Sequence, residues 1–201
     1  MVLCMLSRGI GPLAPTIEAM QQAFRHGWGF EAILGKKLVD AKNHAVHIAI
    51  DRNQDLLLME DDIHVPGRTW VSFRATLGVS DAILVAETKT RTGRSNIWTG
   101  PESGRFLFSG SHFVRIPVDV LKRLKQPIFR SWNFARTIDG EDMIDRGPAK
   151  HGNHSDVFFW FHAMKLEPKP QVAIVGECDH LKHPWNTGET SHADPYVAEC
   201  Y

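Results

Sequence analysis

The sequence has no excess of charge of either sign. Its 201 residues include 23 lysines and arginines against 23 aspartates and glutamates, and the pI is about 7.2. This balance gives no reason to expect nucleic acid, an anionic membrane or an acidic substrate as an obligatory partner. A non-catalytic nucleic-acid-binding module, which usually carries a strong basic surface, is therefore disfavoured.

Cysteine and long apolar runs are also scarce. The three cysteines, Cys4, Cys178 and Cys200, are irregularly spaced and predict neither a disulfide framework nor a zinc knuckle. No apolar run reaches the roughly 18 residues that span a bilayer, and the apolar start at residues 1–6 is too short for a signal peptide. We therefore expect a cytoplasmic protein in a reducing compartment.

Ordinary globular composition, with 43% hydrophobic residues, predicts a single domain with one core. Apolar runs alternate with segments of helical periodicity over the first 60 residues. They predict strands at 2–6, 31–34 and 55–59 and helices at 16–26 and from 38 onward. This order indicates an α/β fold, with a mixed but mostly parallel sheet and helices on both faces.

The rest of the chain is less regular. We expect strands at 82–86 and 172–175, and a strand or hairpin over 106–116 that is broken at 109–111. Helices are expected at 118–125 and 156–166, the second of which contains an aromatic run at 158–161 that is more typical of a core than of a sugar platform. Residues 126–152 are interpreted as a long active-site loop, and 184–201 as a tail without periodicity.

The strongest chemical signal is the acid cluster Glu60-Asp61-Asp62, which ends a buried strand. Clustered carboxylates repel one another unless a cation neutralises them, and a hard divalent ion with oxygen ligands does so. Ligands of parallel sheets bind at the carboxyl ends of strands, so this cluster should face the first-strand loop at 7–9 across one cleft. The alternative is a set of capping or solvated acids.

His180 is the candidate for a third metal ligand, because it follows the strand at 172–175 by a short loop. A neutral imidazole is a suitable ligand for manganese and similar ions. Acids and a histidine at strand ends can also build a metal-dependent phosphoesterase or nucleotidyltransferase. A nucleotidyltransferase would be expected to have a glycine-rich phosphate loop, whereas residues 7–12 contain only two glycines.

The order of five segments resembles the small GT-A fold glycosyltransferases of bacteria and their phages. These segments are 38–46 (LVDAKNHAV), 57–62 (LLMEDD), 109–113 (SGSHF), 155–159 (SDVFF) and 178–181 (CDHL), and the resemblance covers about residues 1–184. It implies a GT-A-like, Rossmann-related domain with a nucleotide-sugar half at about 1–86, an acceptor half at about 87–184 and a tail at 185–201. The implied location for a phage-encoded chain is the host cytoplasm.

The resemblance also implies an activity. The enzyme would move a sugar from a nucleotide diphosphate sugar, most commonly a UDP-sugar, to a hydroxyl acceptor with Mn²⁺ or Mg²⁺ as cofactor. The acceptor is open between a modified base in phage DNA, a glycan, a small molecule and a protein. A basic stretch between Arg115 and Arg136 is one feature that could meet a phosphate-bearing acceptor.

Site roles follow from the resemblance residue by residue. Glu60 and Asp62 look like the DxD motif, with Asp62 as the direct ligand of the catalytic metal, and His180 completes the metal set. Asp156 is the implied general base, although Ser155 stands where the family has Glu. The remaining implied contacts are with the nucleotide (Ser7, Arg8, Lys42, Asn43, Glu60, Asp61) and with the acceptor (Gly110, Ser111).

Overall fold

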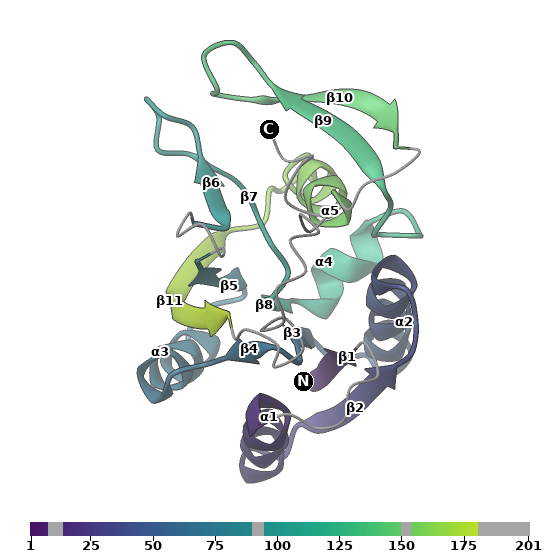
Figure 1. The fold of residues 1–201 in the computed structure, drawn as a ribbon, viewed down its shortest axis with the longest axis vertical. Coiled ribbons are helices and arrows are strands. Elements are labelled where there is room, and N and C mark those ends of the chain that lie inside the picture. The colour runs from purple at the N-terminus through teal and green to yellow at the C-terminus, as the bar shows by residue number, and fades with distance from the viewer. Residues whose placement is uncertain (8–13, 90–94, 150–153, 181–201) are drawn as a thin grey trace, which may run out of the picture.

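The computed structural model describes residues 1–7, 14–89, 95–149 and 154–180. Its main feature is a seven-stranded sheet of order β2-β1-β3-β8-β5-β11-β4 (Figure 1). The strands are β1 (Val2–Ser7), β2 (Gly29–Leu34), β3 (Leu56–Glu60), β4 (Ile63–His64), β5 (Ile83–Thr88), β8 (Phe113–Ile116) and β11 (Val172–His180).

The sheet is mixed. Strands β2, β1 and β3 are mutually parallel, and β11 is parallel to β5. Strand β8 lies antiparallel between β3 and β5, and β4 is antiparallel to β11. Strands β1, β2, β3, β5 and β11 therefore run in one direction, and the predicted α/β class with a mixed sheet is confirmed.

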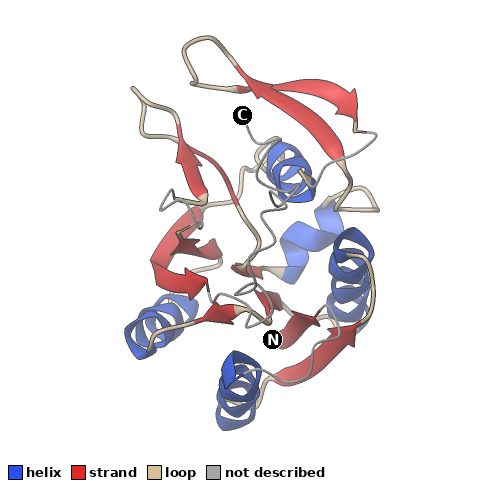
Figure 2. Ribbon diagram, in the orientation of Figure 1, coloured by secondary structure: helices blue, strands red, loops and turns tan. Residues whose placement is uncertain are grey.

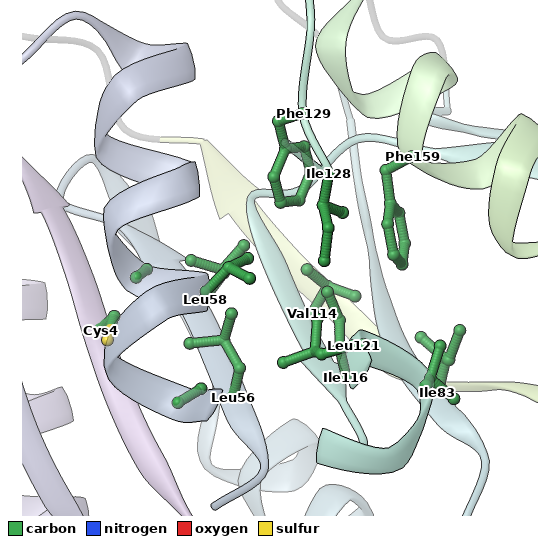
Figure 3. Packing of buried hydrophobic residues seen from close by; sticks show 14 of the residues in the cluster. Cys4, Leu56, Leu58, Ile83, Val114, Ile116, Leu121, Ile128, Phe129 and Phe159 are labelled. Atoms are coloured by element: carbon green, nitrogen blue, oxygen red, sulfur yellow. The ribbon is translucent and has the colours of Figure 1, made fainter. Parts of the chain in front are cut away.

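Helices cover both faces of the sheet. One face packs against α2 (Leu38–Asp51), α4 (Val118–Arg123) and α5 (Ser155–Ala163), and the other against α1 (Ala14–Arg25) and α3 (Gly67–Leu77). Side chains of a strand alternate between the two faces, so Cys4 joins the first core and Met5 the second. Figure 3 shows the first core, to which Leu58 and Val114 of the sheet and Leu121 of α4 contribute.

Because helices cover both faces of the sheet, its central strands appear in the sequence as apolar runs. Every residue from Val2 to Leu6 is at most 3% exposed, because no face of β1 meets solvent. Each such leucine or valine contributes about 1.5–3 kcal/mol to stability by leaving water. Burial also raises the pKa of the Cys4 and Cys178 thiols to about 12, and both are free cysteines, whereas Cys200 lies outside the described residues.

Two hairpins project from the main sheet at one end of the molecule (Figure 2). One consists of β6 (Ile97–Thr99) and β7 (Phe106–Ser109), and the other of β9 (Trp132–Arg136) and β10 (Met143–Pro148). The strands expected within 106–116 are present as β7 and β8 (Phe113–Ile116) with an interruption between them. They do not form a hairpin with each other, since β7 pairs with β6 while β8 enters the central sheet.

The long loop expected at 126–152 is also wrong, because β9 and β10 occupy much of it. Trp132 and Phe134 of β9 contact the rings of Phe158 and Phe161 on α5, with centroids 5.1 and 5.2 Å apart. These tertiary contacts stabilise a hairpin whose other side chains are largely polar and exposed. A strand of this kind has a weak local signal.

Helix α3 and the short strand β4 were not expected from the sequence. Trp70 and Phe73 of α3 are buried against Phe113, with ring centroids 5.2 and 5.3 Å from it. Their spacing of three residues is a helical signal, but Gly67 and the polar residues around it weaken it. Within the described part of the chain, no helix is long and apolar enough to cross a membrane.

Candidate functional site

Four segments bring polar side chains to the same edge of the sheet. Strands β1 and β3 end at Ser7 and Glu60, and the backbone N–H of Asp61 donates to the Leu6 carbonyl oxygen over 3.1 Å. Strand β8 runs the opposite way, so the residue before it, His112, lies at this edge as well, and its carbonyl accepts from Glu60 N over 3.1 Å. Strand β11 ends here at His180.

Asp62 and His180 form one pair at this edge. The Asp62 Oδ2 atom lies 3.3 Å from Nε2 of His180. Strand β4 places them together, because its first residue, Ile63, is in register with His180. His180 is therefore the last residue of β11, and the expectation that it follows a strand ending at 175 by a loop is wrong.

Glu60 and His112 form a second pair. Glu60 Oε2 lies 3.0 Å from His112 Nδ1, and Glu60 is 9% exposed. Burial disfavours the charged ring, but the charge and hydrogen bond of Glu60 outweigh it and raise the pKa of His112 above the ordinary imidazole value. The His112 and His180 rings meet edge to face with centroids 5.7 Å apart, so the two pairs are one cluster.

The donor chemistry of this cluster fits a divalent cation at Asp62 and His180. The Oδ1 atom of Asp62 is buried and has no hydrogen-bond partner within the described residues. A carboxylate oxygen beside an imidazole is a donor pair that suits manganese and related ions. Across the described ranges, no group of three or more histidine, cysteine, aspartate or glutamate side chains is arranged around a common point as a metal site.

A polar hollow of about 240 Å³ opens beside His180. It is lined by Lys89, Glu177, Cys178, Asp179 and His180. The hollow gives the Asp62–His180 end of the cluster space for a small polar ligand.

Lys42 and Asp156 form a third charged pair near the cluster. The Nζ atom of Lys42 lies 2.5 Å from Oδ1 of Asp156 and 3.5 Å from the Ser155 hydroxyl. Asp156 also contributes to raising the pKa of His112, and Lys42 to lowering it, which places both within electrostatic range of that ring. The pair joins α2 to the first turn of α5 at the edge where the site lies.

Asn43, the neighbour of Lys42, is engaged with the backbone. Its Nδ2 donates to the carbonyl oxygens of Val39 and Phe129, and its Oδ1 accepts from Phe129 N over 3.0 Å. This two-way contact holds the segment before β9 against α2. Arg8, which was expected to contact the nucleotide, lies outside the described residues.

Gly110 and Ser111 lie next to His112. A Cβ atom at Gly110 would meet His112 Cδ2 at 3.0 Å and Asn96 Nδ2 at 3.2 Å, so a side chain there would press on the cluster. The Gly110 N–H donates to the Asn96 carbonyl, and Ser111 is buried. His112 itself was missed by the sequence analysis, although it follows the expected break at 109–111 directly.

Most of the aromatic run at 158–161 belongs to the core, as expected. Phe159 and Trp160 are at most 2% exposed, and Trp160 Nε1 donates to the Ser109 carbonyl over 2.7 Å. These two rings are therefore not an open surface for a sugar.

The basic stretch between Arg115 and Arg136 is divided by the fold. Arg115 is buried in an ion pair with Asp55, 2.5 Å away. Lys122 donates to Asn53, which precedes β3, so it lies at the edge opposite the candidate site. Arg136 stacks over Trp98 of the other hairpin, 4.0 Å from the ring centroid. The stretch is not one continuous basic surface.

Comparison with known proteins finds one informative likeness. No family model and no curated protein sequence matches the chain. Among solved structures, the crystal structure of A197 from STIV is similar with a TM-score of 0.57 and 12% sequence identity. The match covers 88% of this chain and 82% of that one. At this identity the likeness shows a shared fold over most of both chains, and nothing further.

Proposed function

We propose that the protein is a metal-dependent glycosyltransferase of the GT-A kind. The observation that carries the proposal is the Asp62–His180 pair at the carboxyl edge of the sheet, where Oδ2 and Nε2 are 3.3 Å apart and Asp62 Oδ1 is buried. Parallel sheets bind ligands at this edge. The neighbouring acids Glu60 and Asp61 carry carboxylates, which can accept hydrogen bonds from the ribose hydroxyls of a sugar nucleotide. The sequence resemblance to GT-A enzymes is the reason for proposing a nucleotide sugar as the donor.

The sheet order supports the same proposal. Strands β2, β1 and β3 form a parallel unit, which suits the nucleotide-sugar half at about 1–86. Strand β8, from the proposed acceptor half, lies between β3 and β5. The two halves therefore share one sheet, and residues of both reach the same edge.

Each side chain has a task in the proposed reaction. A divalent cation held by Asp62 and His180 would supply positive charge to the diphosphate as it leaves the sugar. Glu60, oriented by His112, would accept a hydrogen bond from the ribose, and Ser7, Arg8 and Asp61 would border the nucleotide. Lys42 and Asn43 of α2 contact Asp156 and the Phe129 backbone, respectively.

The acceptor side is proposed at Gly110, Ser111 and Asp156. Asp156 is partly exposed in the first turn of α5, so its carboxylate can receive the proton of an acceptor hydroxyl. The donor is proposed to be a UDP-sugar. Among acceptors, a modified DNA base stays one candidate beside glycans, small molecules and proteins.

A thermal-shift screen of nucleotide sugars with and without Mn²⁺ tests the proposal. A ligand that binds the native state stabilises it by about 2.7 kcal/mol at a hundredfold excess over Kd, so a true donor should raise Tm visibly. We expect UDP and UDP-sugars to raise Tm only when Mn²⁺ is present. Asp62→Asn should abolish this increase.

A metal-dependent phosphoesterase or nucleotidyltransferase would behave differently. A phosphoesterase would hydrolyse model phosphodiesters, and its metal binding would not depend on a nucleotide sugar. If no nucleotide sugar shifts Tm under any metal condition while such esters are cleaved, the glycosyltransferase proposal fails.

A further inference from the structure

We propose that Lys42 is a positioning residue for Asp156, holding that carboxylate in one orientation at the edge of the site. The inference rests on the proposed function, in which Asp156 is the general base. It places Lys42 in contact with Asp156, whereas the sequence resemblance implied that Lys42 contacts the nucleotide. It is carried by the geometry of the partly buried Lys42–Asp156 ion pair, whose Nζ–Oδ1 distance is 2.5 Å.

The burial of the two side chains shows from which side the contact is made. The Lys42 side chain is 1% exposed, whereas the Asp156 side chain is 20% exposed. Lys42 therefore reaches the carboxylate from the interior, and the accessible part of Asp156 faces away from it. A ligand in the site would meet Asp156 first, and Lys42 could act on that ligand only through Asp156.

The surroundings of Lys42 leave its ammonium little freedom. It also contacts the Ser155 hydroxyl at 3.5 Å and lies 5.7 Å from the centroid of the Phe129 ring. Asn43, the next residue, holds the Phe129 backbone in place by two hydrogen bonds. Helix α2 therefore presents a fixed cation to the first turn of α5.

The ion pair lies near a second carboxylate and an imidazole. Glu60 and Asp156 both act on the His112 ring, so two carboxylates lie within range of one imidazole. Within the described residues, Lys42 is the cation that contacts Asp156 directly. A charge-assisted hydrogen bond to a single oxygen orients the carboxylate.

A purely structural ion pair would link α2 to α5 and do nothing more. Removing one partner of a buried ion pair destabilises the fold when the remaining charge cannot be solvated. Asp156 can reach water, so Lys42→Met should fold. The two roles then differ in their effect on turnover, because only a positioning role changes the carboxylate that meets the substrate.

The experiment compares Lys42→Met, Lys42→Arg and Asp156→Asn with the control Lys122→Met, an exposed lysine that bonds to Asn53. With Mn²⁺ and the donor found by the thermal-shift screen, we expect Lys42→Met to lower kcat by about tenfold to a hundredfold, the range for a displaced reacting group. KM for the donor and the Kd of Mn²⁺-UDP should stay within about twofold, since no direct contact is lost.

Two further measurements separate the alternatives. In a double-mutant cycle, Lys42→Met should cost little in an Asp156→Asn background, because both changes affect one carboxylate. Lys42→Arg should recover part of kcat, since it restores a cation. The ¹³Cγ signal of Asp156, assigned by its loss in Asp156→Asn, should move in Lys42→Met and stay unchanged in Lys122→Met.

The outcomes are distinguishable. A large loss of nucleotide affinity in Lys42→Met with kcat unchanged, or full additivity with Asp156→Asn, overturns the positioning role. An unmoved Asp156 signal in a folded Lys42→Met protein overturns it as well, without any activity assay. If the signal moves as expected and no donor is ever turned over, the contact of Lys42 with the Asp156 carboxylate stands, and the proposed glycosyltransferase function is what fails.

Discussion

The carboxylate of Asp62 and the imidazole of His180 lie 3.3 Å apart, although most of the chain separates them in sequence. The contact depends on β4, which follows the acid cluster directly and pairs antiparallel with the end of β11. A two-residue strand thus sets the distance between the two proposed metal ligands. Changes that break the backbone pairing of β4 with β11 should therefore alter this distance.

Asp62→Asn is expected to remove nearly all metal-dependent turnover while leaving the fold intact. The amide keeps the shape of the side chain but not its charge, and the loss of one preorganised electrostatic contact commonly costs about 10²–10³ in rate. Turnover with a UDP-sugar and circular dichroism check both halves of the prediction. Asp81→Asn, which changes an exposed acid just before β5 at the opposite edge of the sheet, is the matched control and should keep its activity.

His180→Gln is expected to weaken Mn²⁺ binding measured by electron paramagnetic resonance in the absence of any nucleotide. Imidazole is a better ligand than an amide for this ion, so the apparent Kd should rise by about tenfold or more. His64→Gln is the control, because His64 lies on the neighbouring strand and contacts Glu18 instead. Equal Mn²⁺ affinity in the two variants would exclude His180 from the metal site.

Gly176→Ala is expected to destabilise the protein by about 1–3 kcal/mol. Gly176 has a φ of +140° within the irregular part of β11, and an added Cβ would lie 2.8 Å from Oγ1 of Thr69. That hydroxyl donates to the Glu177 carbonyl over 2.6 Å and so fixes the last part of β11. Urea unfolding measures the loss.

Gly67→Ala serves as the control for this change, because a Cβ there meets no atom within 4 Å. It should be neutral or slightly stabilising, since alanine restricts the unfolded chain. If Gly176→Ala proves as harmless as Gly67→Ala, the close approach of Thr69 to β11 is not a constraint on the fold.

Much of the sheet could be predicted from local sequence. The strands around 2–6 and 55–59 are largely apolar because both faces of the sheet are covered there, and both are present together with the edge strand expected at 31–34. The β9–β10 hairpin could not be found in the same way, since Trp132 and Phe134 owe their strand conformation to rings on α5. Propensity is weak where tertiary contacts decide the structure.

The residues of the candidate site also differ in how far the sequence predicts them. Asp62 and His180 carry their own signals, an acid cluster and a histidine near the end of a strand. His112 carries none, because its contact with Glu60 exists only when β8 lies antiparallel beside β3. The partners of Lys42 and Asp156 were hidden for the same reason, since no local pattern relates α2 to the first turn of α5.

The His112–Glu60 pair should make stability depend on pH in the metal-free protein. Burial opposes charge on the ring, but Glu60 raises the folded-state pKa of His112 above its unfolded value of about 6.5. The protonated ring therefore stabilises the fold fully below about pH 6.5, and this contribution is lost as the pH rises through the raised folded-state pKa.

Urea unfolding in EDTA at a series of pH values from 5.5 to about 9 measures this dependence, with His112→Gln as the comparison. Glutamine can still donate a hydrogen bond to Glu60 but carries no charge at any pH. The wild-type protein should be the more stable of the two at low pH, and the difference should shrink as the pH rises. A difference that stays constant or grows with pH would mean that His112 binds Glu60 as a neutral ring, because only a ring that gains protons on folding produces the expected sign.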